Sequence, residues 1–128
     1  MERAGYERKL EWQRAMNLVE LIYRLTSYFP VDEKSGLTAT LRRIVTGAAA
    51  KIAEGCSTQS SESLASAQTS LRELVAYLII CRRLKYISNW KLSSLKRRCE
   101  KLVILLDKSN ITLQKTNGEE DTRLRQAA

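Results

Sequence analysis

The sequence predicts an all-α fold, an antiparallel up-down-up-down bundle of four helices. Three observations support this prediction: apolar residues recur at helical spacing in four long segments, short connections join these segments, and the 128 residues include only five glycines and one proline. A β-rich chain would show turn residues about every 8 to 12 positions. Because short connections favour antiparallel neighbours, four such helices predict a single bundle domain.

The first helix is predicted over residues 8–29, where leucines recur on one face and Pro30 ends the segment. A second apolar stripe runs through Trp12, Met16 and Tyr23. This makes the helix apolar over more of its width than one packing contact requires. We therefore expect the second stripe to make a further contact outside this core.

The second helix is predicted over residues 37–54, with Gly55 as its C-terminal stop. Opposite its leucine-rich stripe the side chains are small, and they include Ala39, Gly47 and Ala50. Small side chains let another backbone approach closely. This helix is therefore also expected to make contacts on more than one side, including contacts between subunits.

The third helix is predicted over residues 62–86, after a serine-rich linker that offers several N-caps. Besides its main apolar stripe it carries Tyr77, Ile80 and Leu84 on a second face. One core does not require this second face, so these three residues are further candidates for an oligomer interface.

The fourth helix is predicted over residues 90–113 and is the most clearly amphipathic of the four, with apolar residues on one face and bases on the other. The remaining residues, 114–128, lack periodicity and carry as many bases as acids. The expected organisation is a four-helix bundle over residues 1–113 followed by a disordered polar tail.

The chain is strongly basic, with a formal net charge of +8 and a pI near 9.7. Residues 72–108 contain ten bases and three acids, a net +7, whereas residues 7–34 contain five of each. A localised positive field favours a phosphate polyanion as partner. The open alternative is a solvated face that only keeps the protein soluble. The candidate residues for binding nucleic acid or another phosphate-bearing partner are Arg72, Arg82, Arg83, Lys85, Lys91, Arg97, Arg98 and Lys101.

Two aromatic residues, Tyr86 and Trp90, fall at the predicted turn between the third and fourth helices. We expect them to cap the end of the bundle, with stacking on nucleic-acid bases as the alternative.

Several kinds of chemistry are excluded by composition. The chain has no histidine, and its three cysteines form no CxxC pair, so neither a Ser-His-Asp triad nor a zinc site is expected. The glycines fit no phosphate-binding loop. We expect no catalytic residue, metal, cofactor or small-molecule substrate, and the cysteines are expected to pack in the core. Neither an 18-residue apolar span nor a signal-peptide pattern is present, which predicts a soluble cytoplasmic protein.

The order of several short motifs resembles the four-helix-bundle family of ribosomal RNA intervening-sequence proteins. The motifs are the W-x-x-A that begins at Trp12, the FP that ends at Pro30, GLT with a following RR, and I-A-E-G ending at Gly55. The resemblance covers about residues 8–108. The family includes the accessory variability determinants (Avd) of diversity-generating retroelements. Where many members have Ile-Pro-x-Asn before the Ile-Ala-Glu-Gly end of this motif, the chain has Ala48 to Lys51 instead.

The resemblance implies a ring-shaped homopentamer, in which the surplus apolar faces become subunit contacts. It further implies a non-catalytic accessory protein that binds a reverse transcriptase and its template RNA and supports mutagenic reverse transcription. Two alternatives stay open at this point. One is a homo-oligomer associated with ribosomal RNA that has no polymerase partner, and the other is a scaffold whose charge is incidental.

Overall fold

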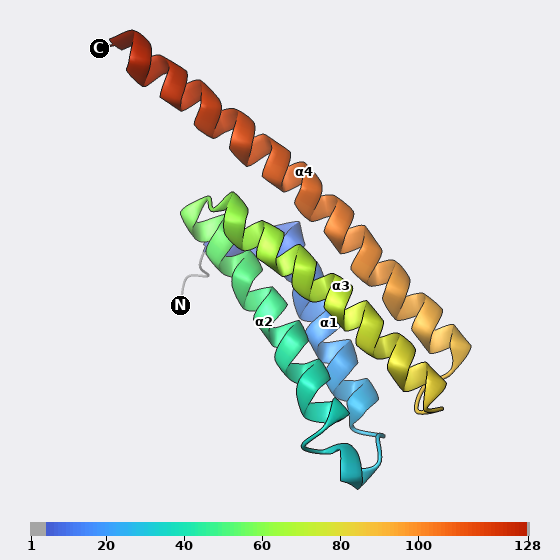
Figure 1. The fold of residues 1–128 in the computed structure, drawn as a ribbon. Coiled ribbons are helices and arrows are strands. Elements are labelled where there is room, and N and C mark those ends of the chain that lie inside the picture. Colours follow the sequence, from blue (N-terminus) through green and yellow to red (C-terminus); the bar gives the residue numbers. More distant parts are fainter. Residues whose placement is uncertain (1–4, 128) are drawn as a thin grey trace.

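The computed structural model describes residues 5–127, which form four long helices and two short 3-10 helices. Consecutive long helices run antiparallel, and the described residues contain no strand (Figure 1). The prediction of an all-α four-helix fold is therefore confirmed. In chain order the elements are η1 (Gly5–Arg8), α1 (Leu10–Thr26), η2 (Val31–Glu33), α2 (Leu37–Thr58), α3 (Ser61–Arg83) and α4 (Asn89–Ala127).

The core lies along the axis of the bundle, where the predicted apolar stripe of each helix turns inward. Because leucine and isoleucine recur every three or four residues, each helix buries one continuous stripe against its neighbours. The large side chains that are fully buried include Leu18 and Ile22 of α1, Leu41 and Ile52 of α2, Leu71 and Leu74 of α3, and Leu102 and Leu106 of α4.

The second stripe of α1 is partly covered within the chain itself. Trp12 is half-buried and meets the ring of Tyr6 edge-on, with the ring centroids 5.4 Å apart. The guanidinium of Arg42 lies 4.5 Å from the centroid of the Tyr23 ring, and its Nε donates to Oγ1 of the buried Thr26 at 2.9 Å. The first contact joins α1 to η1 and the Arg42 contacts join α1 to α2, so packing within one chain explains part of the surplus apolar width.

The prediction that Gly55 ends the second helix is wrong. The helix continues to Thr58, and the residue that leaves it is Gln59, which takes the left-handed conformation with φ 55° and donates its backbone N–H to the carbonyl of Gly55. Gly55 is itself buried inside the helix. A Cβ built there would lie 2.6 Å from Cδ2 of Leu64, so the glycine lets α3 approach closely.

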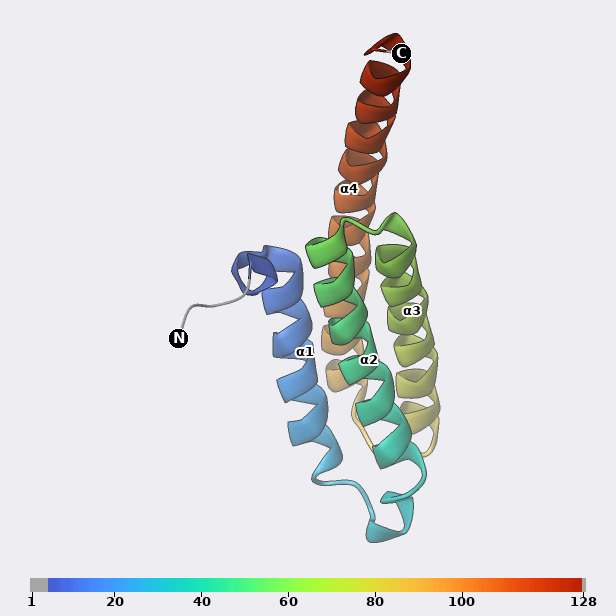
Figure 2. The same ribbon diagram turned by 90° about the vertical axis from the view of Figure 1, so that its left-hand side faces the viewer.

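The prediction of a disordered tail also differs from the structure, in which α4 continues through residues 114–127 and extends beyond the other helices (Figures 1 and 2). All these residues are exposed, so no packing holds them. The local sequence does support a helix, because Glu119 precedes Arg123 by four residues and Asp121 precedes Arg125 by four. The packed part of α4 ends at Leu113, as predicted for the bundle.

The cysteines behave as core residues in two of three cases. Cys81 and Cys99 are buried, and burial raises their thiol pKa values to about 11 and about 12. Cys56 is half-buried, and its pKa is raised less, by burial and then by the negative charge of Glu11.

We expect Cys56 to be alkylated first when the folded protein is treated with iodoacetamide near pH 8. The thiolate is the reacting form, and a pKa of about 11 leaves about one thiolate in a thousand at that pH. Unfolding should lower the pKa of Cys81 and Cys99 toward the ordinary value and expose both thiols. Mass spectrometry of labelled peptides measures the rates, and equal rates for all three cysteines in folded protein would contradict this packing.

Candidate nucleic-acid interface

The candidate site lies beside α4, which packs unequally against its two neighbours. This helix lies closely along α3 and only loosely along α1. On the α3 side the buried Gln68 donates from Nε2 to the carbonyl of Val103 at 2.9 Å and to Oδ1 of Asp107 at 2.6 Å. Because a buried amide is costly to leave unpaired, these bonds hold α4 toward α3. A groove remains between α1 and α4.

Two adjoining hollows of about 350 and 360 Å³ make up this groove, which we call the α1–α4 groove. Ser94 and Arg98 line both hollows, so the groove is continuous. Beyond its Arg14 end, Oγ of Ser109 donates to Oε2 of Glu11 at 3.0 Å and joins α4 to α1.

The first half of the groove is polar and positive. It is lined by four bases and no acid, with two small polar side chains and one leucine between them. Its residues are Arg14, Asn17, Leu18, Ser94, Arg97, Arg98 and Lys101. Four cations without an acidic partner in the lining make this half suited to phosphate groups.

The second half has an apolar floor and aromatic walls. Leu21, Leu25 and Leu95 form the apolar part, while Arg24, Lys91 and Arg98 are the cations of its lining. Its remaining lining residues are Tyr28, Trp90 and Ser94.

The aromatic walls of this second half are unusually open to solvent. Tyr28 is 85% exposed and Trp90 is 71% exposed, and Nζ of Lys91 lies 5.3 Å from the centroid of the Trp90 ring system. Tyr28 and Trp90 line one hollow together with three leucines, and an exposed apolar patch of this kind indicates a binding surface where a single exposed ring would not.

Helical spacing explains why these residues meet. On α1 the groove residues Arg14, Asn17, Leu21 and Arg24 follow one another at steps of three, four and three, so they share one face, and Tyr28 follows two residues beyond the end of the helix. The α4 residues Lys91, Ser94, Arg98 and Lys101 show the same alternation. Since the two helices are antiparallel, the Arg14 end of α1 meets the Lys101 end of α4, and Tyr28 lies at the Trp90 end (Figure 2).

The structure divides the binding residues predicted from sequence into two groups. Lys91, Arg97, Arg98 and Lys101 line the α1–α4 groove. The others lie outside it. Arg82 hydrogen-bonds through Nε to Oδ1 of Asn89 at the turn between α3 and α4, Arg83 and Lys85 are exposed at the same turn, and Arg72 lies on the α3–α4 side of the bundle.

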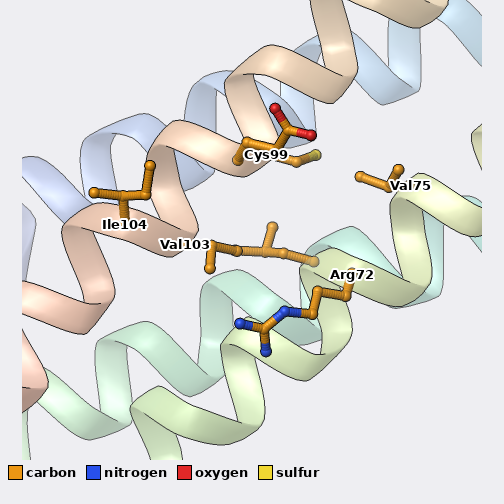
Figure 3. A pocket seen from close by; sticks show the side chains of 7 residues that line it. Arg72, Val75, Cys99, Val103 and Ile104 are labelled. Carbon is orange, nitrogen blue, oxygen red and sulfur yellow. The ribbon is translucent and has the colours of Figure 1, made fainter.

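Arg72 borders a separate hollow of about 440 Å³ between α3 and α4. Figure 3 shows Arg72 and Val75 on α3 across from Cys99, Val103 and Ile104 on α4. This hollow is mainly apolar, and its lining contains one base, Arg72, and one acid, Glu100. It therefore lacks the excess of positive charge that the α1–α4 groove has.

The groove residues that the sequence prediction missed include two bases, Arg14 and Arg24, and the aromatic Tyr28. The two arginines fall in residues 7–34, whose net charge is zero, so a search for segments of high net charge does not identify them. Their helical spacing with Leu21 and Tyr28 is the signal that could have found them.

The two aromatics of the turn have different environments. Tyr86 packs against Phe29 with ring centroids 5.4 Å apart and caps the end of the bundle as predicted. Trp90 is exposed in the groove, which contradicts its predicted capping role. Trp90 lies about 140° and 180° around α4 from the buried Leu95 and Cys99, at about 100° per residue, so it faces away from the core.

The candidate interface residues occupy two kinds of site. Trp12, Met16 and Tyr77 are half-buried against the core. The others lie on three helices: Tyr23 on α1, the small residues Ala39, Gly47 and Ala50 on α2, and Ile80 on α3, with Leu84 directly after that helix. Ala39 and Ala50 are exposed, no atom lies within 4 Å of a Cβ built on Gly47, Tyr23 is partly exposed beside Arg42, and Ile80 and Leu84 are about half exposed.

Residues 5–127 contain no cluster of three or more Cys, Asp or Glu side chains with the geometry to hold a metal ion. Within the same range, none of the helices combines the length and apolarity needed to cross a membrane.

Comparison with known proteins points to one family. The model of the 23S rRNA-intervening sequence protein family matches residues 8–108, which include α1, α2, α3, the packed part of α4 up to Lys108 and both sides of the groove. No individual curated protein matches the chain. The match spans more than three quarters of the sequence and agrees with the helical fold. The chain belongs to the 23S rRNA-intervening sequence protein family.

Proposed function

We propose that this protein is a non-catalytic RNA-binding protein that holds the phosphate backbone in the α1–α4 groove. The observation that supports this most is the groove's lining, which contains six bases and no acid. The six bases are Arg14, Arg24, Lys91, Arg97, Arg98 and Lys101. Released counterions drive such binding, so it is strong at low salt and depends little on sequence.

The length of the groove sets the size of its ligand. From Arg14 to its last residue, Thr26, α1 rises about 18 Å at 1.5 Å per residue, and Tyr28 extends the groove a little further. A nucleic-acid strand rises about 3.4 Å per nucleotide when stacked, so the groove holds about six nucleotides. The family's description names 23S rRNA, which agrees with RNA as the ligand.

Equilibrium binding of a fluorescent RNA across a salt series tests the proposal. With up to six phosphate contacts, the logarithm of the association constant should fall against the logarithm of salt concentration with a slope of about −4 per bound groove. No binding at about 0.05 M salt, or an affinity that stays constant to about 0.3 M, would contradict it. Tight binding of an acidic polypeptide but not of RNA would make an acidic protein the partner instead.

We propose further that the protein forms a homo-oligomer, a ring of five by the family resemblance. Exposed apolar side chains of α2 and α3, among them Ala39, Ala50 and Ile80, are uncovered within the chain and available for such contacts. A closed ring would repeat the groove once per subunit, and several grooves on one RNA raise the apparent affinity through high effective concentration. The mass in solution, measured in the binding buffers, tests this. A monomer at every protein concentration used would rule it out.

The finer role is proposed from the resemblance to Avd. In that role the protein acts beside a reverse transcriptase of a diversity-generating retroelement and supports copying of its template RNA. The alternative is a homo-oligomer associated with ribosomal RNA that has no polymerase partner. A reverse transcriptase encoded beside this gene should co-purify with the protein in the first case. A gene neighbourhood without one favours the second, and RNA binding through the groove is expected in both.

A further inference from the structure

The two halves of the α1–α4 groove differ in chemistry. The Arg14 half offers cations and small polar groups, whereas the Trp90 half offers a leucine floor and two exposed aromatic side chains. A phosphate backbone alone needs only the first half. The second half is therefore suited to a ligand that has a flat apolar part as well as phosphate groups.

An unpaired nucleotide has both parts, because its phosphate is an anion and its base is a flat ring with two π-faces. Bases stack on Trp and Tyr side chains whatever their sequence. The 71% exposure of Trp90 leaves ring surface free beside its contact with Lys91, and Lys91 supplies a cation near that ring. Arg24 and Arg98 lie in the same half and can bind the phosphates that flank a stacked base.

The size of the groove favours single strands over duplexes. Its two hollows of about 350 and 360 Å³ lie between two neighbouring helices and are small beside a duplex, so a duplex would reach only the rim. The bases of a duplex are also already stacked on one another. Bases become available to aromatic side chains where the strand is unpaired.

We propose that the Trp90 end of the α1–α4 groove is a base-stacking site, so that the protein selects single-stranded over double-stranded nucleic acid. This rests on the proposed function, since the phosphates of the same strand occupy the basic half. Tyr28 and Trp90 supply the stacking surfaces, and Leu21, Leu25 and Leu95 form the apolar floor beneath them.

Three RNA ligands test this with the unmodified protein at about 0.05 M salt. They are a single strand of about twelve nucleotides, the duplex of that strand with its complement, and an abasic strand of the same length and charge. Base stacking predicts that the single strand binds roughly 5- to 100-fold more tightly than the abasic strand. It also predicts weaker binding of the duplex, although the duplex carries twice as many phosphates.

Two single substitutions test which side chains stack on the bases. Trp90→Ala and Tyr28→Ala should each weaken binding of the single strand by about fivefold or more and leave binding of the abasic strand unchanged. Both side chains are largely exposed, so the fold should tolerate the changes. In a Trp12→Phe background Trp90 is the sole tryptophan, and its fluorescence should be quenched by the single strand and not by the abasic strand.

The outcomes separate this inference from the proposed function. Equal, salt-dependent binding of all three ligands, unaffected by Trp90→Ala, would overturn base stacking and leave phosphate binding intact. Tighter binding of the duplex would also overturn it. Failure of all three ligands to bind would overturn both the stacking site and the RNA-binding function.

Discussion

Replacing Arg14, Arg98 and Lys101 together with alanine is expected to weaken RNA binding by about 10- to 100-fold at ~0.15 M salt. All three residues are exposed and line the polar half of the α1–α4 groove. Removing three phosphate contacts should also reduce the magnitude of the salt slope by about 2. Fluorescence anisotropy with a labelled RNA measures both quantities, and circular dichroism checks that the helices remain folded.

A second triple variant controls for net charge. Arg72→Ala, Arg83→Ala and Lys96→Ala remove the same three charges from exposed positions on α3 and α4 that do not line the groove. If the groove holds the RNA, this variant should bind within about threefold of the unmodified protein. Equal losses of RNA affinity in the two triple variants would mean that the overall positive charge of the protein, and not the groove, determines RNA binding.

The second large effect concerns stability. Gly55→Ala is expected to lower the free energy of unfolding by about 1–2 kcal/mol. The new methyl would lie 2.6 Å from Cδ2 and 2.7 Å from Cγ of the buried Leu64, and 3.1 Å from the carbonyl oxygen of Ser60. This overpacking should outweigh the stabilisation of about 1 kcal/mol that alanine gives over glycine within a helix.

Gly47→Ala is the matched control, because the two glycines lie in the same helix. No atom lies within 4 Å of a Cβ built at Gly47, so alanine should leave stability unchanged or raise it by up to about 1 kcal/mol. Thermal melts at one protein concentration should show a Tm about 4–8 °C lower for Gly55→Ala only. Equal Tm values would mean that Leu64 and α3 move aside without cost.

The helices themselves were predictable because their signal is local. Leucines at steps of three and four identified all four core stripes, and Pro30 and the serine-rich linker marked two of the connections. The error at Gly55 arose because one residue type has two uses. A glycine serves as a helix stop through its backbone freedom or as a site of close approach through its missing side chain. Only the position of Leu64 decides between them.

The tail error has a similar origin. Residues 114–127 lack apolar periodicity because they pack against nothing, and this absence resembles disorder. Their helical pairs of opposite charge are weak, at a few tenths of a kcal/mol each, so they predict a helix less strongly than a core stripe does.

The site was only half predictable. The bases of α4 in the groove follow from the charge between residues 72 and 108, and the sequence alone identifies them. The contribution of α1 could not follow from summed charge, because Glu11 and Glu20 of the same helix offset Arg14 and Arg24 in the total. Which side of α4 would stay open depended on the Gln68 hydrogen bonds to Val103 and Asp107, a tertiary contact across more than thirty residues.

Photo-crosslinking of bound RNA followed by mass spectrometry of the attached peptides tests most directly that the α1–α4 groove is the binding site. The groove predicts crosslinks in two segments, residues 14–28 of the α1 side and residues 90–101 of α4, with Tyr28 and Trp90 among the attached side chains. Crosslinks concentrated on the opposite side of the bundle, around Arg72 and Ile104, would contradict it and assign RNA binding to the α3–α4 face.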